Sequence, residues 1–322
     1  MVLKIITTSL ENISQNTENI HNNYSIALGN FDGIHKGHQQ VIKPIFNYSE
    51  TEKIIPSLVT FIPHPQEFFR GKKKQLLTPI PEKCHILEKL GVKQLILLPF
   101  NQELASLSAE KFVEDILIKK IKASFISIGE DFCFGYQRQG NAKYLQTLGS
   151  KYNIKVSITK EQNLTIEGES IKISSSYIRQ NLRDGKPELA NQMLGREYQI
   201  IGEVIEGQKL GRKIGFPTAN LMIPDEKFIP KNGVYAVKVD VENDSLLSNL
   251  QGVMNIGTRP TIDGNNFSIE VHLLDYHENL YHKNLIVKLV KFLRPENKFS
   301  SLDELKYQIE LDCKQTRLIL KN

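Results

Sequence analysis

Two histidines follow the first strongly apolar run of this 322-residue sequence. The run ends in a glycine-containing stretch, Gly29–Gly33, and His35 and His38 come directly after it. Glycines at a strand-to-helix turn let backbone amides approach a polyphosphate, and the helix N-terminus adds partial positive charge there. Side chains three residues apart share one face of a helix, so both imidazoles can donate to one phosphoryl group. The pattern predicts adenylyl transfer, in which the protein orients the reactants and stabilises charge at the α-phosphate.

Two other interpretations of the histidine pair are weaker. The imidazoles could only shape a tight turn, but here a glycine-containing turn and paired histidines coincide directly after a predicted strand. They could bind zinc, but no third ligand lies at a recognisable spacing.

Two loops are expected near the same edge of the predicted sheet. Asp131 lies in Gly129–Gly135, which follows a later strand. Ligands of such sheets bind beyond the carboxyl ends of the strands, where this loop begins. His64 lies in Thr60–Pro65, where an aromatic and a histidine could contact a flat ring, although the prolines could equally just shape the loop.

A serine run opens a later helix. Ser174 and Ser175 precede Arg179, which lies four positions after Ser175. Hydroxyls and a guanidinium at a helix start could hold a triphosphate from the opposite side. The same run is as typical of an ordinary helix N-cap.

The second half carries a threonine and an asparagine in an extended segment. Thr218 and Asn220 are two residues apart, so their side chains face the same way and can both meet one hard cation. Mg2+ carried by ATP has this chemistry. The preceding glycine segment, Gly207–Gly215, contains basic residues and is expected to act as a lid.

A glutamate on a later strand is the candidate base. Glu270, His272 and Leu274 share one face of the predicted strand. A carboxylate that points into a phosphate site can accept a hydroxyl proton during phosphoryl transfer. The alternative is an exposed strand glutamate that pairs across to a lysine.

The first half has the rhythm of a parallel sheet with helices between the strands. Strands are expected at Ser25–Leu28, Ile54–Phe61, Gln94–Pro99, Ser124–Ile128 and Lys155–Thr159. Ser108 is the expected N-cap of one helix, and Gly91 the stop of another. This half is predicted to be an α/β domain of the doubly wound, Rossmann-like type.

The second half reads as a small antiparallel β-barrel with a terminal α-helix. Strands are expected at Tyr198–Val204, Val234–Val241, Ser268–Leu274 and Leu285–Leu293. Ser301 and Glu304 form a capping-box pattern before the C-terminal helix. The boundary is placed near Asp184–Pro187, between two short helical pieces.

Composition is that of a soluble globular protein, with 40% hydrophobic and 24% charged residues. A net charge of +5 is modest and spread along the chain, so it does not decide between phosphorylated small molecules and nucleic acid. Three cysteines without a CxxC pair indicate neither a disulfide framework nor a thiolate zinc site. Because no signal sequence or membrane span is recognisable, a cytoplasmic protein is expected.

The motifs together resemble a known family. The His35–His38 segment with Ser174–Arg179 resembles the HxGH nucleotidyltransferase superfamily. With Thr60–Pro65 and Gly129–Gly135, the first half looks like the FMN adenylyltransferase module of bacterial bifunctional riboflavin kinase/FAD synthetases. The second half resembles their riboflavin kinase module through four segments: Pro217–Asn220, Gly252–Thr261, Glu270–Asp275 and Arg294–Glu296.

The resemblance implies two activities and a division of labour. Residues 1–184 are expected to form the FMN adenylyltransferase (FAD synthetase) domain and residues 185–322 the riboflavin kinase domain. ATP and Mg2+ are the implied cofactors, riboflavin and FMN the substrates, and FMN and FAD the products. By resemblance, Thr218 and Asn220 bind MgATP and Glu270 deprotonates the ribityl 5′-hydroxyl, while His35 and His38 serve adenylyl transfer.

Further ligand-binding residues are expected from the same motifs. They are Gly29, Asn30, Phe31, Asp32, Gly33, His64, Asp131, Ser174, Ser175, Arg179, Gly211, Arg212, Gly215, Arg259 and Arg294. The sequence departs from the family pattern at His282, at Cys133 and at Leu76–Thr78. These departures concern flavin affinity and loop geometry rather than the reaction.

Two other functions fit the sequence less well than the enzyme does. A flavin-binding regulator without turnover would not need the base Glu270, and an aminoacyl-tRNA synthetase-like enzyme would need a basic anticodon-type domain that is not recognisable. The expected partners are therefore small-molecule flavins and nucleotides, without nucleic acid or membrane, and the protein is expected to be a monomer or weak homo-oligomer.

Overall fold

The structure, a computed structural model, describes residues 3–7, 24–207, 210–261 and 264–321. It divides into two compact units. The first comprises Met1–Lys74 and Lys83–Ser174, and the second comprises Gln75–Glu82 and Ser175–Asn322. None of the helices in the described ranges combines the length and apolar character needed to cross a bilayer.

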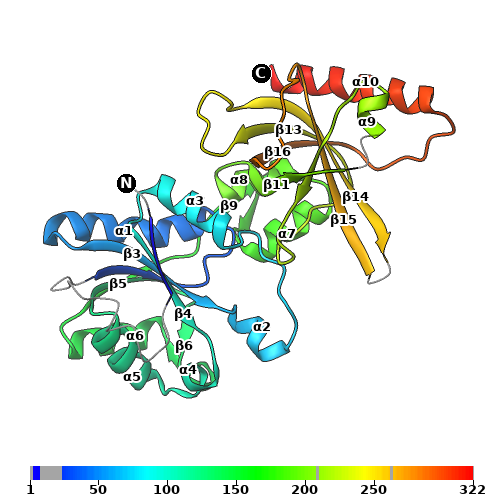
Figure 1. The fold of residues 1–322 in the computed structure, drawn as a ribbon. Helices are drawn as coiled ribbons and strands as arrows, with labels where there is room; N and C mark the ends of the chain where they lie inside the picture. The colour runs from blue at the N-terminus through cyan, green and yellow to red at the C-terminus, as the bar shows by residue number, and fades with distance from the viewer. Residues whose placement is uncertain (1–2, 8–23, 208–209, 262–263, 322) are drawn as a thin grey trace. The chain divides into compact units, whose positions relative to one another are not determined.

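A parallel sheet of six strands forms the centre of the first unit (Figure 1). In spatial order the strands are β1 (Lys4–Thr7), β4 (Gln94–Pro99), β3 (Ile55–Ile62), β2 (Tyr24–Leu28), β5 (Ala123–Gly129) and β8 (Lys155–Thr159). Five of them were predicted to within one or two residues. The edge strand β1 was missed, because only Ile6 of its four residues is buried and no apolar run marks it.

Helices cover both sides of this sheet (Figure 1). Figure 1 shows α1 (Lys36–Glu52) and α3 (Ile80–Leu90) on one side, and α5 (Ala109–Lys111) and α6 (Ala142–Lys151) on the other. The shorter helices are α2 (Pro65–Arg70) and α4 (Gln102–Ser106). Helices on both faces explain why β2 is buried at all five positions. The prediction of a doubly wound α/β domain is confirmed.

The predicted cap at Ser108 is present, since its hydroxyl accepts a hydrogen bond from the Lys111 amide at 3.2 Å. The helix then continues as a π-helix, Phe112–Lys120, which the sequence did not indicate. The described part of this unit also contains two small hairpins. They pair β6 (Cys133–Phe134) with β7 (Gly140–Asn141), and β9 (Asn163–Ile166) with β10 (Glu169–Lys172).

The second unit is built on a closed antiparallel barrel, as predicted. Its strands, in order around the barrel, are β11 (Tyr198–Ile205), β12 (Ala219–Met222), β15 (Gly264–Leu273), β14 (Leu250–Thr261), β13 (Gly233–Val241) and β16 (Asn284–Arg294). The strands β12 and β14 were not predicted. β12 has only four residues, and β14 contains Gly252, Gly257 and Pro260, residues that usually mark turns.

The barrel is accompanied by the helices α7 (Ser175–Arg183), α8 (Pro187–Leu194), the short α9 (Leu210–Lys213) and the terminal α10 (Leu302–Leu320). The Ser301 hydroxyl accepts from the Glu304 amide at 3.2 Å, so the predicted N-cap of α10 is confirmed. Buried Cys313 of α10 packs with Val234 and Val253 of the barrel. The expected boundary near Asp184–Pro187 lies between α7 and α8.

A buried ion pair joins eight residues from early in the sequence to the barrel unit. The Lys227 ammonium donates to Glu82 Oε2 at 2.5 Å, to the Leu77 carbonyl at 2.8 Å and to the Gln199 carbonyl at 2.6 Å. The same ammonium lies 4.2 Å from the centre of the Tyr198 ring. Burying both charges is tolerated because each finds several partners. Segment 75–82 is therefore an integral part of the second unit.

Candidate active sites

The glycine turn after β2 has an unusual backbone. Phe31 and Ile34 have positive φ angles of 48° and 42°, and Gly33 has 92°. A positive φ at a β-branched residue such as Ile34 is rare and strained, and strain of this kind concentrates at ligand-binding sites. At the start of the turn, the Gly29 amide donates to the Val59 carbonyl of β3 at 3.2 Å. Phe31 and Asp32 are buried within it.

The two histidines lie together at the start of α1. His35 is the N-cap, and its Nδ1 accepts a hydrogen bond from the His38 amide at 3.2 Å. The two rings stack with centroids 3.6 Å apart and an angle of 16° between their planes. Because Nδ1 of His35 accepts, a neutral His35 ring carries its proton on Nε2, which is then a donor. The structure thus brings the predicted pair into one place.

Asp131 lies at the same end of the sheet as this turn. β2 and β5 are parallel neighbours, so Gly29 and Gly129 both follow the carboxyl ends of their strands. A Cβ added to Gly129 would approach Oδ1 of Asp131 to 3.0 Å, so the carboxylate folds back over this glycine. A side chain at position 129 would therefore require the Asp131 carboxylate to shift by a few tenths of an ångström.

His64 is engaged within its own loop. It caps α2, with Nδ1 accepting from the Gln66 amide at 3.1 Å, and its Nε2 lies 3.0 Å from Nζ of Lys74. Lys74 also donates to the Gln66 side chain at 2.9 Å. These contacts order the loop that the sequence had suggested for ring binding.

The serine run and Arg179 belong to the second unit, apart from Ser174. Arg179 is buried, and its guanidinium donates to the Ser175 carbonyl at 3.2 Å and to the Gln75 carbonyl at 3.0 Å. It also lies 5.8 Å from the centre of the Phe228 ring. These contacts give Arg179 a structural task in holding segment 75–82, and its predicted binding of phosphate stays a prediction.

The barrel brings Thr218, Asn220 and Glu270 together. The Thr218 hydroxyl lies 3.4 Å from Oε2 of Glu270, and Asn220 is directly opposite Glu270 in the pairing of β12 with β15. Ser268, two residues before Glu270 on the same face, donates to Oε1 at 3.2 Å. Sequence reasoning missed Ser268, although the period of two along a strand would have placed it there.

His272 fixes the backbone that carries Thr218. Its Nδ1 lies 2.8 Å from the Pro217 carbonyl, and its ring packs edge-on against Phe216 at 5.4 Å. His272 and Glu270 lie two residues apart on β15. One strand therefore carries both the candidate base and the group that positions the neighbouring Thr218 segment.

The described part of the glycine segment before Thr218 includes the short helix α9. The Phe216 amide donates to the Gly211 carbonyl at 2.8 Å, and Gly215 has a φ of 90°. Arg212 is exposed, and any side chain at Gly207 would collide with the Asn220 amide. Residues 208 and 209 of the expected lid lie outside the described residues.

The two remaining arginines differ. Arg259 lies on β14, and its side chain is outside the described part of the structure. Arg294 at the end of β16 forms a bidentate pair with Asp312 of α10, with Nε to Oδ1 at 3.0 Å and Nη2 to Oδ2 at 2.7 Å. This guanidinium anchors the terminal helix to the barrel, and its binding of ligand stays a prediction.

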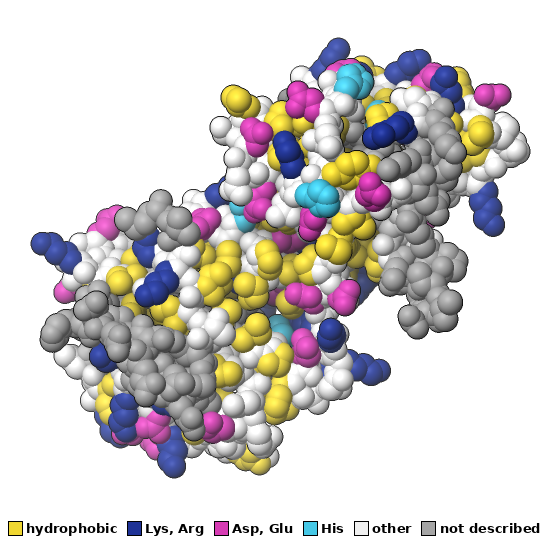
Figure 2. All heavy atoms as spheres, viewed as in Figure 1, with side chains coloured by type: hydrophobic (Ala, Val, Ile, Leu, Met, Phe, Trp, Pro, Cys, Tyr) yellow, Lys and Arg dark blue, Asp and Glu magenta, His cyan; other side chains and the backbone are white. Residues whose placement is uncertain are grey.

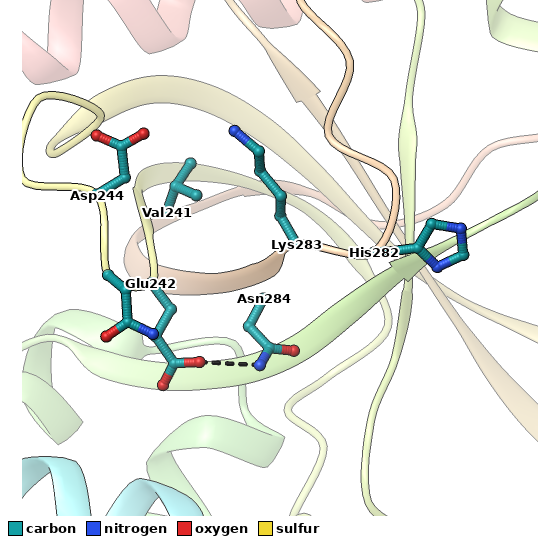
Figure 3. Close-up of a pocket in the computed structure, with 7 residues that line it drawn as sticks. Val241, Glu242, Asp244, His282, Lys283 and Asn284 are labelled. Carbon is teal, nitrogen blue, oxygen red and sulfur yellow. Dashed lines mark hydrogen bonds between the residues drawn. The ribbon is translucent and has the colours of Figure 1, made fainter.

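A polar hollow of about 380 Å³ lies where β13 ends and β16 begins (Figure 3). It is lined by 241–244 and 282–284. The Asn284 amide donates a hydrogen bond of 2.8 Å to Glu242, and Figure 3 shows the His282 ring pointing away from this pair. None of the predicted site residues lines this hollow.

Comparison with known proteins identifies both halves. The sequence profile described as FAD synthetase matches residues 17–177, and the one described as riboflavin kinase matches residues 194–320. The bifunctional riboflavin kinase/FMN adenylyltransferase of Buchnera aphidicola subsp. Schizaphis graminum (strain Sg) is 40% identical over 301 residues, 92% of this chain and 94% of the relative. The protein of the same description from Escherichia coli (strain K12) is 38% identical over 288 residues, 89% and 90% of the two chains.

A solved structure has the same fold over nearly the whole chain. It comes from Streptococcus pneumoniae and is described as a macrolide-efflux protein, with a TM-score of 0.84, 29% identity, and coverage of 98% of this chain and 99% of its own. The matched profiles and relatives define a protein with a nucleotidyltransferase domain followed by a riboflavin kinase domain. The chain belongs to the family of bifunctional riboflavin kinase/FMN adenylyltransferases. The matched profiles leave residues 178–193 unassigned, so a boundary after residue 184 stays a prediction.

Proposed function

We propose that this bifunctional flavin-cofactor enzyme phosphorylates riboflavin at the Thr218–Glu270 site and adenylylates the resulting FMN at the glycine turn with His35 and His38. One observation carries this division. The stacked histidines and the Thr218–Glu270 pair belong to different compact units, and each lies within the stretch that matches one of the two families. Residues 1–184 and 185–322 are the proposed domains.

In adenylyl transfer, a phosphate oxygen of FMN attacks the α-phosphorus of ATP, and pyrophosphate leaves. The nucleophile is already anionic, so the protein need not remove a proton from it. The imidazole Nε2–H of His35 and the adjacent His38 ring are arranged to donate to the phosphoryl oxygens as negative charge develops. The turn Gly29–Gly33 and Asp131 are the proposed neighbours of the nucleotide, with His64 and the Ser174–Arg179 segment as further contacts.

In phosphorylation, the ribityl 5′-hydroxyl of riboflavin attacks the γ-phosphorus of ATP, and ADP leaves. Glu270 accepts the hydroxyl proton. Ser268 and Thr218 hold one carboxylate oxygen each, at 3.2 and 3.4 Å, so the base is oriented before substrate binds. Gly211, Arg212, Gly215, Arg259 and Arg294 are the proposed additional contacts to nucleotide or flavin.

Mg2+ is proposed to enter the kinase site with ATP. The Thr218 hydroxyl and the Asn220 amide are oxygen donors beside a carboxylate, the hard ligands that Mg2+ prefers. Mg2+ bound to phosphates needs only one or two protein ligands, and Thr218 and Asn220 would supply them. When bound, the cation would neutralise charge on the phosphates.

The cellular context is proposed from the substrates, which are soluble small molecules. Figure 2 shows the described Lys and Arg side chains spread over the visible face without one continuous basic patch. The protein is proposed to act in the cytoplasm as a monomer or weak homo-oligomer, without nucleic acid or membrane partners.

Chromatography of riboflavin, FMN and FAD tests the division. Wild-type protein with riboflavin and MgATP should form FMN and then FAD. Glu270→Ala should abolish FMN formation and leave FMN-to-FAD conversion, and His35→Ala with His38→Ala should do the reverse. Loss of both activities from both folded variants would refute the division.

A further inference from the structure

Lys83 is a buried lysine that no sequence motif singled out. It lies on α3 and is only 6% exposed. Its ammonium donates a hydrogen bond of 3.0 Å to the carbonyl oxygen of Asn30, in the glycine turn. The hydroxyl of Thr60, at the end of β3, donates to the same oxygen at 3.1 Å. Two side chains from different elements therefore hold one carbonyl group of the turn.

Burying the Lys83 amine carries a free-energy cost, which is expected to persist only where the amine has a function. Desolvation of a buried ammonium is strongly unfavourable, and burial lowers the pKa of Lys83 to about 8 despite the nearby Asp32 carboxylate. An apolar side chain of similar length would fill the same space without this cost. The position thus points to a role for the charge and the hydrogen bond.

Peptide geometry shows what the hydrogen bond does. In a trans peptide the carbonyl of one residue and the N–H of the next point in opposite directions. Holding the Asn30 carbonyl towards Lys83 and Thr60 therefore aims the Phe31 N–H away from them, on the other side of the turn. Phe31 has a φ of 48°, so the backbone would not hold this orientation by its own preference.

We propose that Lys83 is a positioning residue for adenylyl transfer, which fixes the Asn30–Phe31 peptide with its N–H towards the ATP phosphates and places a positive charge behind the turn. The proposal rests on the assignment of this turn to ATP. This role explains why Thr60 and Lys83 both donate hydrogen bonds to the Asn30 carbonyl oxygen. It also explains why a charged side chain is buried next to Asp32.

The test uses the full chain and its two reactions. Lys83→Met removes the amine with little change in length, Thr60→Val removes the other donor, and Lys89→Met on the exposed part of the same helix is the matched control. For each protein, KM for ATP, KM for FMN and kcat are measured in FMN adenylylation. Riboflavin phosphorylation by the same sample reports whether the second unit is intact, and an unchanged KM for FMN reports whether the first unit keeps its fold.

Lys83→Met should raise KM for ATP between about 10- and 100-fold, the range for one hydrogen bond to a charged group. KM for FMN, riboflavin phosphorylation and the Lys89→Met control should stay within about twofold of wild type. Thr60→Val should shift KM for ATP in the same direction by less. Combining Lys83→Met with Thr60→Val should raise KM for ATP by less than the product of the two single fold-changes, because both donors act on one oxygen.

The outcomes separate this proposal from the proposed function. Wild-type protein without FMN adenylylation would refute the function itself. An unchanged KM for ATP in Lys83→Met, with adenylylation intact, would overturn the role of Lys83. If Lys83→Met loses adenylylation altogether, with or without riboflavin phosphorylation, its first unit is misfolded. Thr60→Val then decides, since an unchanged KM for ATP in that variant also overturns the proposal.

Discussion

Asn220 and Glu270 face each other across β12 and β15, and the Thr218 hydroxyl lies 3.4 Å from the same carboxylate. A single strand pairing thus sets the spacing between the proposed Mg2+ ligands and the proposed base. Because side chains alternate along a strand, a slip of one residue would turn Asn220 away from Glu270. The closed barrel fixes this register from both neighbours of β15, since β14 pairs with it along ten residues.

Glu270→Gln should remove the base while keeping the shape of the site. The amide has nearly the volume of the carboxylate and can still meet Thr218 and Ser268. We expect kcat for FMN formation to fall between about 100- and 10,000-fold, the usual contribution of a general base. FMN-to-FAD conversion by the same protein is the control. If kcat stayed within a few-fold of wild type, another group would be the base.

Ser268→Ala should loosen the orientation of Glu270. One neutral hydrogen bond of 3.2 Å to Oε1 is lost, so we expect a drop of about 3- to 10-fold in kcat for riboflavin phosphorylation. KM for ATP should not change, because Ser268 is not a proposed contact to nucleotide. A rise in KM for ATP without a change in kcat would assign Ser268 to substrate binding.

The sequence predicted those parts of the fold whose signal is local. β2 is buried at every position, and α10 has a capping residue before a periodic apolar face, so both were found. β1 buries only Ile6, and β12 has four residues of which Leu221 alone is buried. Such strands exist because a sheet edge and a closing barrel need them, and that requirement is not visible in their own residues.

The same limit applies to the sites. The His35–His38 and Thr218–Asn220 pairs could be predicted from the sequence, because the two members of each pair are two or three residues apart. Lys227 and Glu82 are 145 residues apart, and nothing near either one indicates a buried partner. Lys83 lies 53 residues from Asn30 in the same way. Contacts of this kind follow from the topology and could only be found in the folded chain.

The pair formed by Lys227 and Glu82 should be essential to the stability of the barrel unit. Both groups are buried, and burial raises the pKa of Glu82. Glu82→Ala leaves the ammonium without its counter-ion and should lower the free energy of unfolding by about 3–5 kcal/mol. Urea titration followed by riboflavin kinase activity measures this.

A double variant separates the charge from the packing. Glu82→Leu with Lys227→Met replaces the ion pair by apolar groups of similar size, which is often neutral or stabilising. It should therefore be more stable than Glu82→Ala. A double variant less stable than the single one would mean that the carbonyl contacts of Lys227, and not the charge pair, hold segment 75–82 in place.

Lys83 should make the stability of the first unit depend on pH in a predictable direction. Burial lowers its pKa from 10.5 to about 8, so between these values the unfolded chain holds a proton that the folded chain has lost. Stability therefore rises with pH across this window, and below pH 8 both states are protonated and the cost of burial stays constant. The difference between the two pKa values corresponds to a gain of about 3 kcal/mol in the free energy of unfolding across the window.

The contribution of Lys83 can be isolated by urea unfolding of wild type, Lys83→Met and Lys89→Met at pH 7, 8, 9 and 10, followed by FMN adenylylation. Relative to Lys83→Met, both wild type and Lys89→Met should gain stability as pH rises from about 8 to about 10. Parallel curves for all three proteins would show that Lys83 does not lose its proton in this window.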